Sequence, residues 1–264
     1  MIAVDWFFYD APMWFSLPTF VLLAVVLSLG ILLAVRPWVT RAAEKNPDWD
    51  RVLGYAMQSY GLLFGVVLAL IAVSVYENFE RVNGVVLDEA SVIGAMFRDF
   101  SGYPADVAEQ LHEELRRYVQ GVITTDWPLM QENIIPAEGN EHVESMGRLL
   151  FEFEPSSIGQ QVLHTQTVDT FNDFLIARRA RLDETKLALP PLLWAVLAIG
   201  ALLNALMISL VEAKSLRIHL IMSGIIAVFV SLVIYTTASM DHPYAGIVSI
   251  TPEAFENLAQ LLGG

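Results

Sequence analysis

Four stretches of the chain are apolar around the whole circumference of a helix and hold almost no ionisable side chain. They cover about residues 17–35, 53–75, 192–211 and 218–235. Crossing a hydrocarbon layer of about 30 Å takes roughly 20 helical residues at about 1.5 Å each. A single Asp, Lys or Arg at the centre of such a span costs about 2.5–3.5 kcal/mol on insertion scales. We therefore predict four transmembrane helices.

Between the second and third stretches the pattern becomes amphipathic. From Leu53 to Phe100 the chain has no proline, and beyond Val75 apolar residues recur at intervals of three and four. This spacing predicts that the second helix continues past the membrane as a stalk. Residues 168–182 form a matching face that ends at Pro190 and Pro191, where a new helix is expected to begin. We expect the two stalks to pack together.

The segment between the stalks is predicted to be helical as well. A helix from Pro104 to about Thr124 precedes a loop at 126–140 that holds Pro128, Pro136 and Gly139. A short helix at 142–153 and a capping turn at 154–157 follow, and a terminal helix is expected at 252–262. No strand pattern of useful length occurs. The predicted fold class is an all-α integral membrane protein with a helical extramembrane domain inserted between transmembrane helices two and three.

These elements divide the chain into four predicted parts. They are an N-terminal membrane hairpin at 1–76, an acidic helical extramembrane domain at 77–189, a C-terminal membrane hairpin at 190–240 and a short tail helix at 241–264.

The composition limits the classes of partner that the protein can bind. Hydrophobic residues make up 55% of the chain and charged residues 17%, so the lipid bilayer is the expected partner. The net charge of −14 argues against nucleic acid, because no basic patch is available to neutralise phosphates. The absence of cysteine excludes disulfides and thiol chemistry.

Loop charges predict an orientation in a bacterial inner membrane. The connections at 36–51 and 214–217 carry Lys and Arg, whereas the segments before the first helix and after Met240 carry none. The positive-inside rule then places the connections in the cytoplasm and both termini and the central domain in the periplasm. The basic residues between Arg178 and Lys186 act against this assignment.

Enzyme signatures are missing. His112-Glu113-Glu114 resembles the start of a zinc-protease motif, but Arg116 stands where the second histidine is required. The sequence has no phosphate-binding loop, dinucleotide fingerprint or nucleophile elbow. We expect no enzyme, no catalytic residue, no metal site and no cofactor.

Small residues recur every four positions in the second helix, at Gly61, Gly65 and Ala69. We call this set the small-residue stripe. Such a stripe lets another helix approach closely, either within one subunit or between subunits.

Polar residues gather at the outer end of the same helix: Ser74, Glu77, Asn78, Arg81 and Asp88. Glu77 and Arg81 are four residues apart and can pair. In several copies around an axis, these side chains would form polar rings at a pore mouth, a common device for ion selectivity. An ordinary solvated helix end with a weak surface ion pair is the alternative.

The sequence also resembles the bacterial bestrophin-like family of membrane proteins from about Tyr55 to Phe255. The matching segments are 60–65, Glu77-Asn78-Phe79, Glu89-Ala90-Ser91, Phe97-Arg98-Asp99, Arg117-Tyr118-Val119, Asp126-Trp127-Pro128, 178–182, Leu192-Leu193-Trp194 and Asp241-His242-Pro243 with Gly246. The resemblance implies kinship with bestrophins, oligomeric ion channels whose second membrane helix lines the pore and whose insert and termini are cytoplasmic. The aromatic pore neck and acidic calcium clasp of bestrophins are not recognisable here.

Taken with that resemblance, the pattern favours a homo-oligomeric pore for small inorganic ions, with helix two nearest the axis. An acidic vestibule would concentrate cations, so we expect a preference for cations. The alternative is a membrane-anchored sensor or scaffold whose acidic domain binds a partner and which has no pore.

Overall fold

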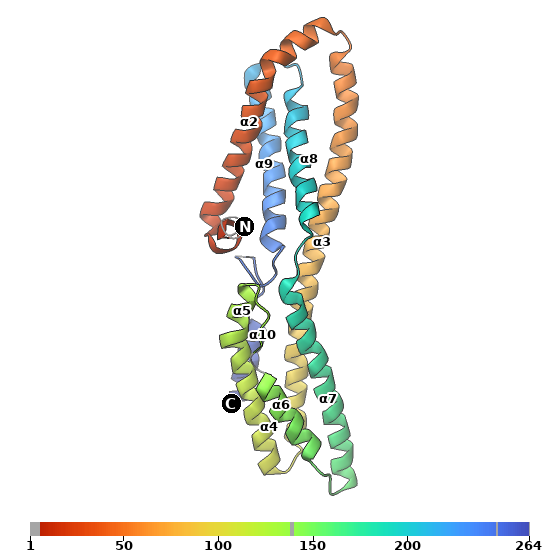
Figure 1. The fold of residues 1–264 in the computed structure, drawn as a ribbon, viewed down its shortest axis with the longest axis vertical. Helices are drawn as coiled ribbons and strands as arrows, with labels where there is room; N and C mark the ends of the chain where they lie inside the picture. The colour runs from red at the N-terminus through yellow and green to blue at the C-terminus, as the bar shows by residue number, and fades with distance from the viewer. Residues whose placement is uncertain (1–5, 138–139, 247, 264) are drawn as a thin grey trace. The chain divides into compact units, whose positions relative to one another are not determined.

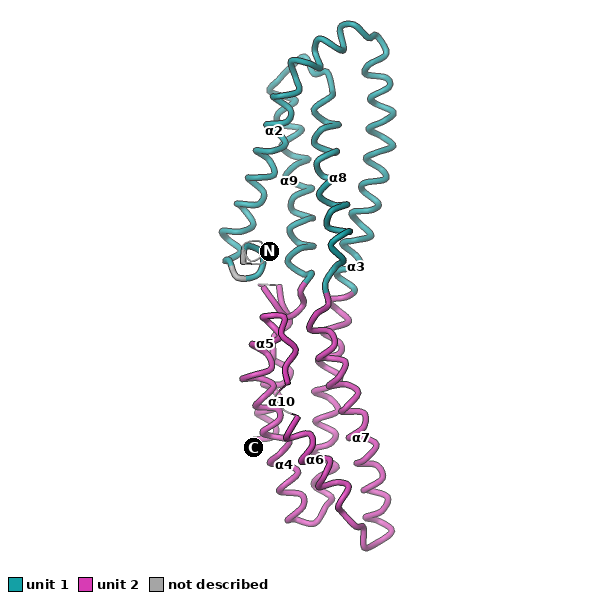
Figure 2. The backbone as a smooth tube through the Cα atoms, viewed as in Figure 1, with its two compact units in different colours: residues 1–77, 188–241 teal, residues 78–187, 242–264 magenta. Residues whose placement is uncertain are grey.

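Helices form all the regular structure of the described residues, as the sequence predicts. The structure is a computed structural model that describes residues 6–137, 140–246 and 248–263, and no strand occurs in these ranges (Figure 1). The chain divides into two compact units (Figure 2). Unit 1 comprises residues 1–77 and 188–241, and unit 2 comprises residues 78–187 and 242–264.

Unit 1 holds the apolar helices. They are α2 (Met13–Lys45), the first part of α3 (Trp49–Phe100), α8 (Pro191–Ser209) and α9 (Leu216–Met240), with the short π-helix η1 (Trp6–Asp10) before them. Among the described residues, four helices are long and apolar enough to cross a membrane, and they contain the four predicted apolar stretches almost completely. α2, α3 and α9 run past the predicted stretches, because an apolar run marks only the part of a helix that suits hydrocarbon, whereas α8 ends two residues before its predicted stretch does. Pro191 opens α8 at the first helical position, where its missing N–H costs nothing.

The two basic connections of unit 1 meet at one end. The Trp49 indole donates a hydrogen bond to the Leu210 carbonyl at 3.1 Å. The Arg36 guanidinium donates to the Ala213 carbonyl at 3.5 Å. These contacts join the α2–α3 connection to the α8–α9 connection, so their positive charges face the same side of unit 1.

Side chains of α3 pack against α8 in unit 1. Phe64, Leu68, Ile71 and Val75 are buried together with Leu197. The Tyr60 hydroxyl donates to the Gly200 carbonyl, and the Tyr60 and Phe64 rings stack with centroids 5.8 Å apart. Gly200 is required at this contact, because a Cβ there would overlap the Phe64 ring.

Unit 2 holds the rest of α3 and the remaining helices. They are α4 (Ala105–Gly121), the π-helix η2 (Val122–Asp126), α5 (Trp127–Gln131), α6 (Asn140–Glu152), α7 (Ile158–Asp183), the 3-10 helix η3 (Glu184–Lys186) and α10 (Glu253–Gly263). Their shared core includes Met96, Leu115, Phe174 and Phe255. Ser157 caps α7 by accepting a hydrogen bond from the Gln160 N–H at 3.2 Å, as the predicted capping turn requires.

The predicted stalks do pack together. In unit 2, α3 and α7 lie side by side and run in opposite directions (Figure 1). Three polar contacts tie them in antiparallel order: Arg81 with Glu184 of η3, Glu89 with Arg181, and Asp99 with Thr170.

One predicted loop is partly wrong. Residues 126–131 are helical in η2 and α5, although Pro128 suggested a loop over 126–140. Pro128 lies in the first turn of α5, where proline is tolerated. The neighbouring Trp127 and Met130 are buried, and their burial favours the helical turn.

The Gly200 contact can be tested by adding one methyl group. We expect Gly200→Ala to destabilise the protein by about 1–3 kcal/mol, because the Phe64 ring must move out of its site. Thermal unfolding of the detergent-solubilised protein measures this loss. Gly224→Ala in α9 is the matched control, because no atom lies within 4 Å of its added Cβ. Phe64→Leu should recover part of the loss; equal melting of the two alanine variants would contradict the packing argument.

Candidate functional site: the polar residues of α3 and a buried charge network

The predicted pore-mouth residues lie along α3. Ser74 and Glu77 are exposed in unit 1, and in unit 2 Arg81 and Asp88 are exposed while Asn78 is half-buried. The Arg81 guanidinium pairs with Glu184 and donates to the Asn78 amide oxygen at 3.4 Å. The four-residue spacing allowed Glu77 to pair with Arg81. Glu184 takes that place because η3 brings its carboxylate beside α3.

The small-residue stripe faces open space within the protomer. Gly61, Gly65 and Ala69 are exposed, and no atom lies within 4 Å of a Cβ built on either glycine. The stripe therefore does not serve as a contact between helices of one described chain. Its use between subunits stays a prediction.

The carboxylate of Glu89 on α3 points inward, and the sequence analysis did not predict this burial. Asp88 is exposed, but its neighbour Glu89 has 0% of its surface exposed. Glu89 lies in a row of buried α3 positions spaced three and four residues apart: Val82, Val86, Glu89, Ile93, Met96 and Phe100. Its carboxylate therefore enters the core of unit 2.

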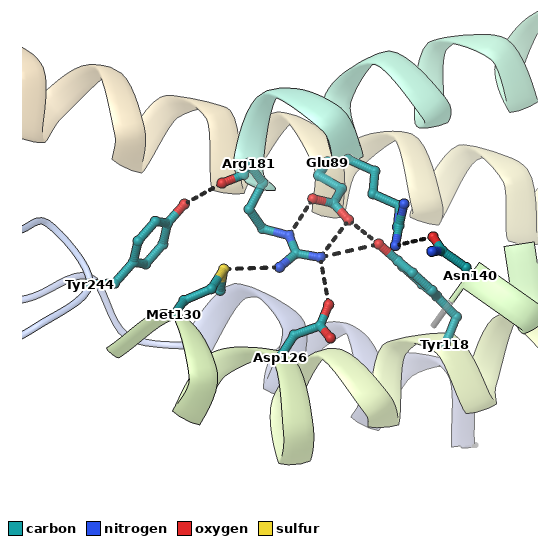
Figure 3. A network of polar contacts seen from close by, with 8 residues as sticks. Glu89, Tyr118, Asp126, Met130, Asn140, Arg181 and Tyr244 are labelled. Carbon is teal, nitrogen blue, oxygen red and sulfur yellow. Dashed lines mark hydrogen bonds and ion pairs between the residues drawn. The ribbon is translucent and has the colours of Figure 1, made fainter. Parts of the chain in front are cut away.

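Arg181 of α7 meets this carboxylate (Figure 3). Its Nε atom lies 2.6 Å from Glu89 Oε2, and its Nη2 atom lies 3.1 Å from Asp126 Oδ2 of η2. Arg181 has 0% exposure and Asp126 has 2%. A guanidinium suits this position because its five donors can serve several acceptors in one plane.

Further contacts surround the guanidinium (Figure 3). Arg181 Nη2 donates to the Tyr118 hydroxyl at 3.3 Å, and that hydroxyl donates to Glu89. Arg181 Nη1 lies 3.3 Å from the Met130 sulfur. The Tyr244 hydroxyl donates to the Arg181 carbonyl at 3.3 Å and so attaches the segment after α9. We call Glu89, Tyr118, Asp126 and Arg181 the buried charge network.

Burial and mutual charge shift the pKa values of this network. Burial raises the pKa of Tyr118 well above its ordinary value, and the neighbouring Glu89 carboxylate raises it further. Burial also raises the pKa of Asp126, although Arg181 opposes that shift. Burial alone would lower the pKa of Arg181, but Glu89, Tyr118 and Asp126 together raise it. Arg181 therefore stays charged, and the network holds two carboxyl groups around one permanent cation.

The histidines are dispersed. His112 Nε2 lies 2.9 Å from the Phe97 carbonyl, and His164 Nδ1 lies 2.8 Å from the Tyr103 hydroxyl. His142 lies 2.8 Å from Glu114. In the parts of the chain that the structure describes, no group of three His, Asp or Glu residues could hold a metal ion.

A profile of the Bestrophin-like domain matches residues 22–255. The fold is similar to a crystal structure of a bacterial Bestrophin homologue from Klebsiella pneumoniae with a point mutation, at 12% identity and a TM-score of 0.62, covering 94% of this chain and 99% of that one. A second mutant of that homologue has 12% identity and a TM-score of 0.59, covering 93% and 97%. A crystal structure of a further membrane protein variant has 12% identity and a TM-score of 0.62, covering 95% of this chain and 100% of that one. No curated protein matches the chain.

Removing one charge tests the buried network. We expect Glu89→Gln to cost about 3–5 kcal/mol of folding stability, because the Arg181 cation keeps its place in a dry core with less compensation. The midpoint of thermal unfolding, followed by tryptophan fluorescence, reports the loss. Glu80→Gln is the matched control, since Glu80 is exposed on the same helix. The double variant Glu89→Met/Arg181→Met should lose less than the summed single variants; wild-type melting of Glu89→Gln would refute the network's structural role.

Proposed function

Because the chain belongs to the Bestrophin-like domain family, we propose that it is an ion channel of a bacterial inner membrane, built from several copies around one axis. The observation that carries this proposal is the family match, which covers three of the four membrane-capable helices completely and α2 from Leu22 onward. The exposed faces of α3 support the proposed arrangement of the copies around the axis.

The faces of α3 suit a helix that lies nearest such an axis. Successive residues turn by about 100°, and the face at Phe64, Leu68 and Ile71 packs on α8. The opposite face carries Leu62, Val66 and Val73, all exposed in the protomer. In a ring of copies this apolar face would point inward as a narrow hydrophobic constriction, a form of gate that closes by dewetting.

The small-residue stripe lies between those two faces. In a ring this flank meets the α3 helix of the next copy, and small side chains at Gly61 and Gly65 permit close approach. The space around both glycines within the protomer supports this use. Such a head-to-tail contact closes into a ring when the rotation between copies closes.

Charge supports a preference for cations. Unit 2 contains 21 Asp and Glu residues and nine Lys and Arg residues, a net charge of −12, so it carries most of the chain's −14. A surface of one sign raises the local concentration of counter-ions. We propose that Ser74, Glu77, Asn78, Arg81 and Asp88, which follow one another along α3, form the polar mouth of the pore.

Ion flux through liposomes that contain the purified oligomer tests the channel. We expect K⁺ to pass more readily than Cl⁻. Glu77→Gln and Asp88→Asn should each lower that preference by about two- to tenfold, because each removes a charge at the mouth. Glu144→Gln, an exposed carboxylate of α6, is the control and should change nothing.

The possible results of this experiment distinguish the channel itself from its preference for cations. Preferential Cl⁻ flux would keep the channel and overturn the cation preference. Folded oligomers that pass no small ion, and particles without a central axis, would replace the channel with a membrane-anchored scaffold whose acidic unit binds a partner.

We also propose that unit 2 and both termini lie in the periplasm, because both basic connections lie at one end of unit 1. The chain has no cysteine, so single introduced thiols report their side. We expect a membrane-impermeant maleimide to label Ser101→Cys of unit 2 in cells with a permeabilised outer membrane. It should label Asn46→Cys, in the α2–α3 connection, only after lysis. The reverse pattern would place unit 2 in the cytoplasm.

A further inference from the structure

Unit 1 contains an apolar cavity between α2, α8 and α9. Its volume is about 320 Å³, within the range of ligand pockets in proteins. Five alanines line it, and their short side chains leave the space: Ala24, Ala198, Ala201, Ala205 and Ala227. The cavity therefore results from small residues on three helices that are predicted to lie in the bilayer.

The cavity is long. On α8 its lining extends from Trp194 to Ile208, which spans about 21 Å at about 1.5 Å per residue. One leaflet of a bilayer has a hydrocarbon depth of about 15 Å, half of the usual 30 Å. The cavity is therefore longer than the hydrocarbon depth of one leaflet and can hold an acyl chain over that whole depth.

Aromatic rings gather at one end of the cavity. Phe8, Phe20 and Trp194 line it there. The Phe8 and Phe20 centroids are 5.5 Å apart, and both rings contact Tyr235, whose hydroxyl lies 2.6 Å from the Ser16 hydroxyl. Aromatic side chains of this kind prefer the level of the lipid headgroups. This end therefore corresponds to the point at which an acyl chain enters the hydrocarbon.

The cavity is not sealed from its surroundings. Leu27 of α2 and Leu202 of α8 line it, yet 60% and 49% of their surfaces are exposed. An opening between helices of the membrane unit leads into hydrocarbon. Lipid chains can reach the cavity by this route without crossing a polar barrier.

The chemistry of the walls excludes a strongly polar occupant. Ser28, Asn204 and Ser231 are the polar side chains that line the cavity apart from the Trp194 ring, and the Ser231 hydroxyl donates to the Val228 carbonyl of its own helix at 2.9 Å. The Trp194 N–H donates to Asp241 at 3.1 Å. Water is disfavoured in apolar cavities, and an empty one loses the dispersion contacts of its walls.

We propose that this cavity binds one acyl chain of a membrane lipid, which completes the packing of α2, α8 and α9. The inference requires that unit 1 lies in a bilayer. It does not require a pore, so it can hold where ion flux is absent.

A photoreactive lipid tests the proposal. The purified oligomer is placed in liposomes that contain a small fraction of phosphatidylcholine with a diazirine in one acyl chain, and crosslinked peptides are identified by mass spectrometry. We expect saturable crosslinks to cavity residues such as Ala201 and Ala205. Ala198→Phe should lower them by about tenfold, because the added ring fills the cavity. Ala195→Phe, an exposed α8 position outside the lining, should leave them unchanged.

The second variant Ala24→Leu fills the cavity from α2 and should also lower the crosslinks, so misfolding of one variant leaves the test intact. Size-exclusion elution reports that each variant is assembled. Crosslinks that rise without saturation and ignore both variants would indicate ordinary surrounding lipid and overturn the proposal. A folded, assembled oligomer that gives no lipid adduct at the cavity residues would also overturn it.

Discussion

The ion pair between Glu89 and Arg181 joins the two longest helices of unit 2 in a core that water does not reach. Two charges withdrawn from water in this way stabilise a fold only while they remain together, because either one left alone is strongly unfavourable. Arg181 also contacts several other elements of unit 2. Tyr118 of α4, Asp126 of η2, Met130 of α5 and Tyr244 after α9 each contact Arg181. The Arg181 side chain thus contacts α3, α4, η2 and α5, and its backbone carbonyl holds the segment after α9.

A different interaction, close packing of side chains, stabilises unit 1. Lipid tails are as apolar as leucine, so burial of apolar surface between its helices gains little, and close packing has to supply the stability. The contact of Phe64 with Gly200 and the five alanines of the cavity show how side-chain size decides where helices touch and where space remains. α3 belongs to both units. Leu68, Val75, Val82, Glu89 and Met96 are all buried and stand seven residues apart, so one helical repeat serves both environments.

Features that depend on local sequence could be predicted, whereas features that depend on contacts between distant residues could not. Four charge-free stretches predicted the membrane-capable helices, because length and hydropathy are local properties. Glu89 occupies a position that leucine, valine or methionine take elsewhere in the repeat, and its charge gave no indication that it would be buried. Its partner Arg181 is 92 residues away, and a single sequence does not pair such distant charges. A loop was predicted at residues 126–131 for a similar reason. Pro128 is a local signal, whereas Trp127 is buried by the distant rings of Tyr244 and Phe255.

The neighbouring carboxylates Asp88 and Glu89 show how unit 2 can be both acidic and stable. Among its described residues, Glu89 and Asp126 are the buried acids, and Arg181 compensates them. The remaining acidic excess lies at or near the surface, where water screens the repulsion between like charges and the cost to folding is small. A net charge of −12 is therefore compatible with a compact helical unit. Because the charges that organise the core are separate from those that set the surface potential, the surface charge of this unit can vary without disturbing the network around Arg181.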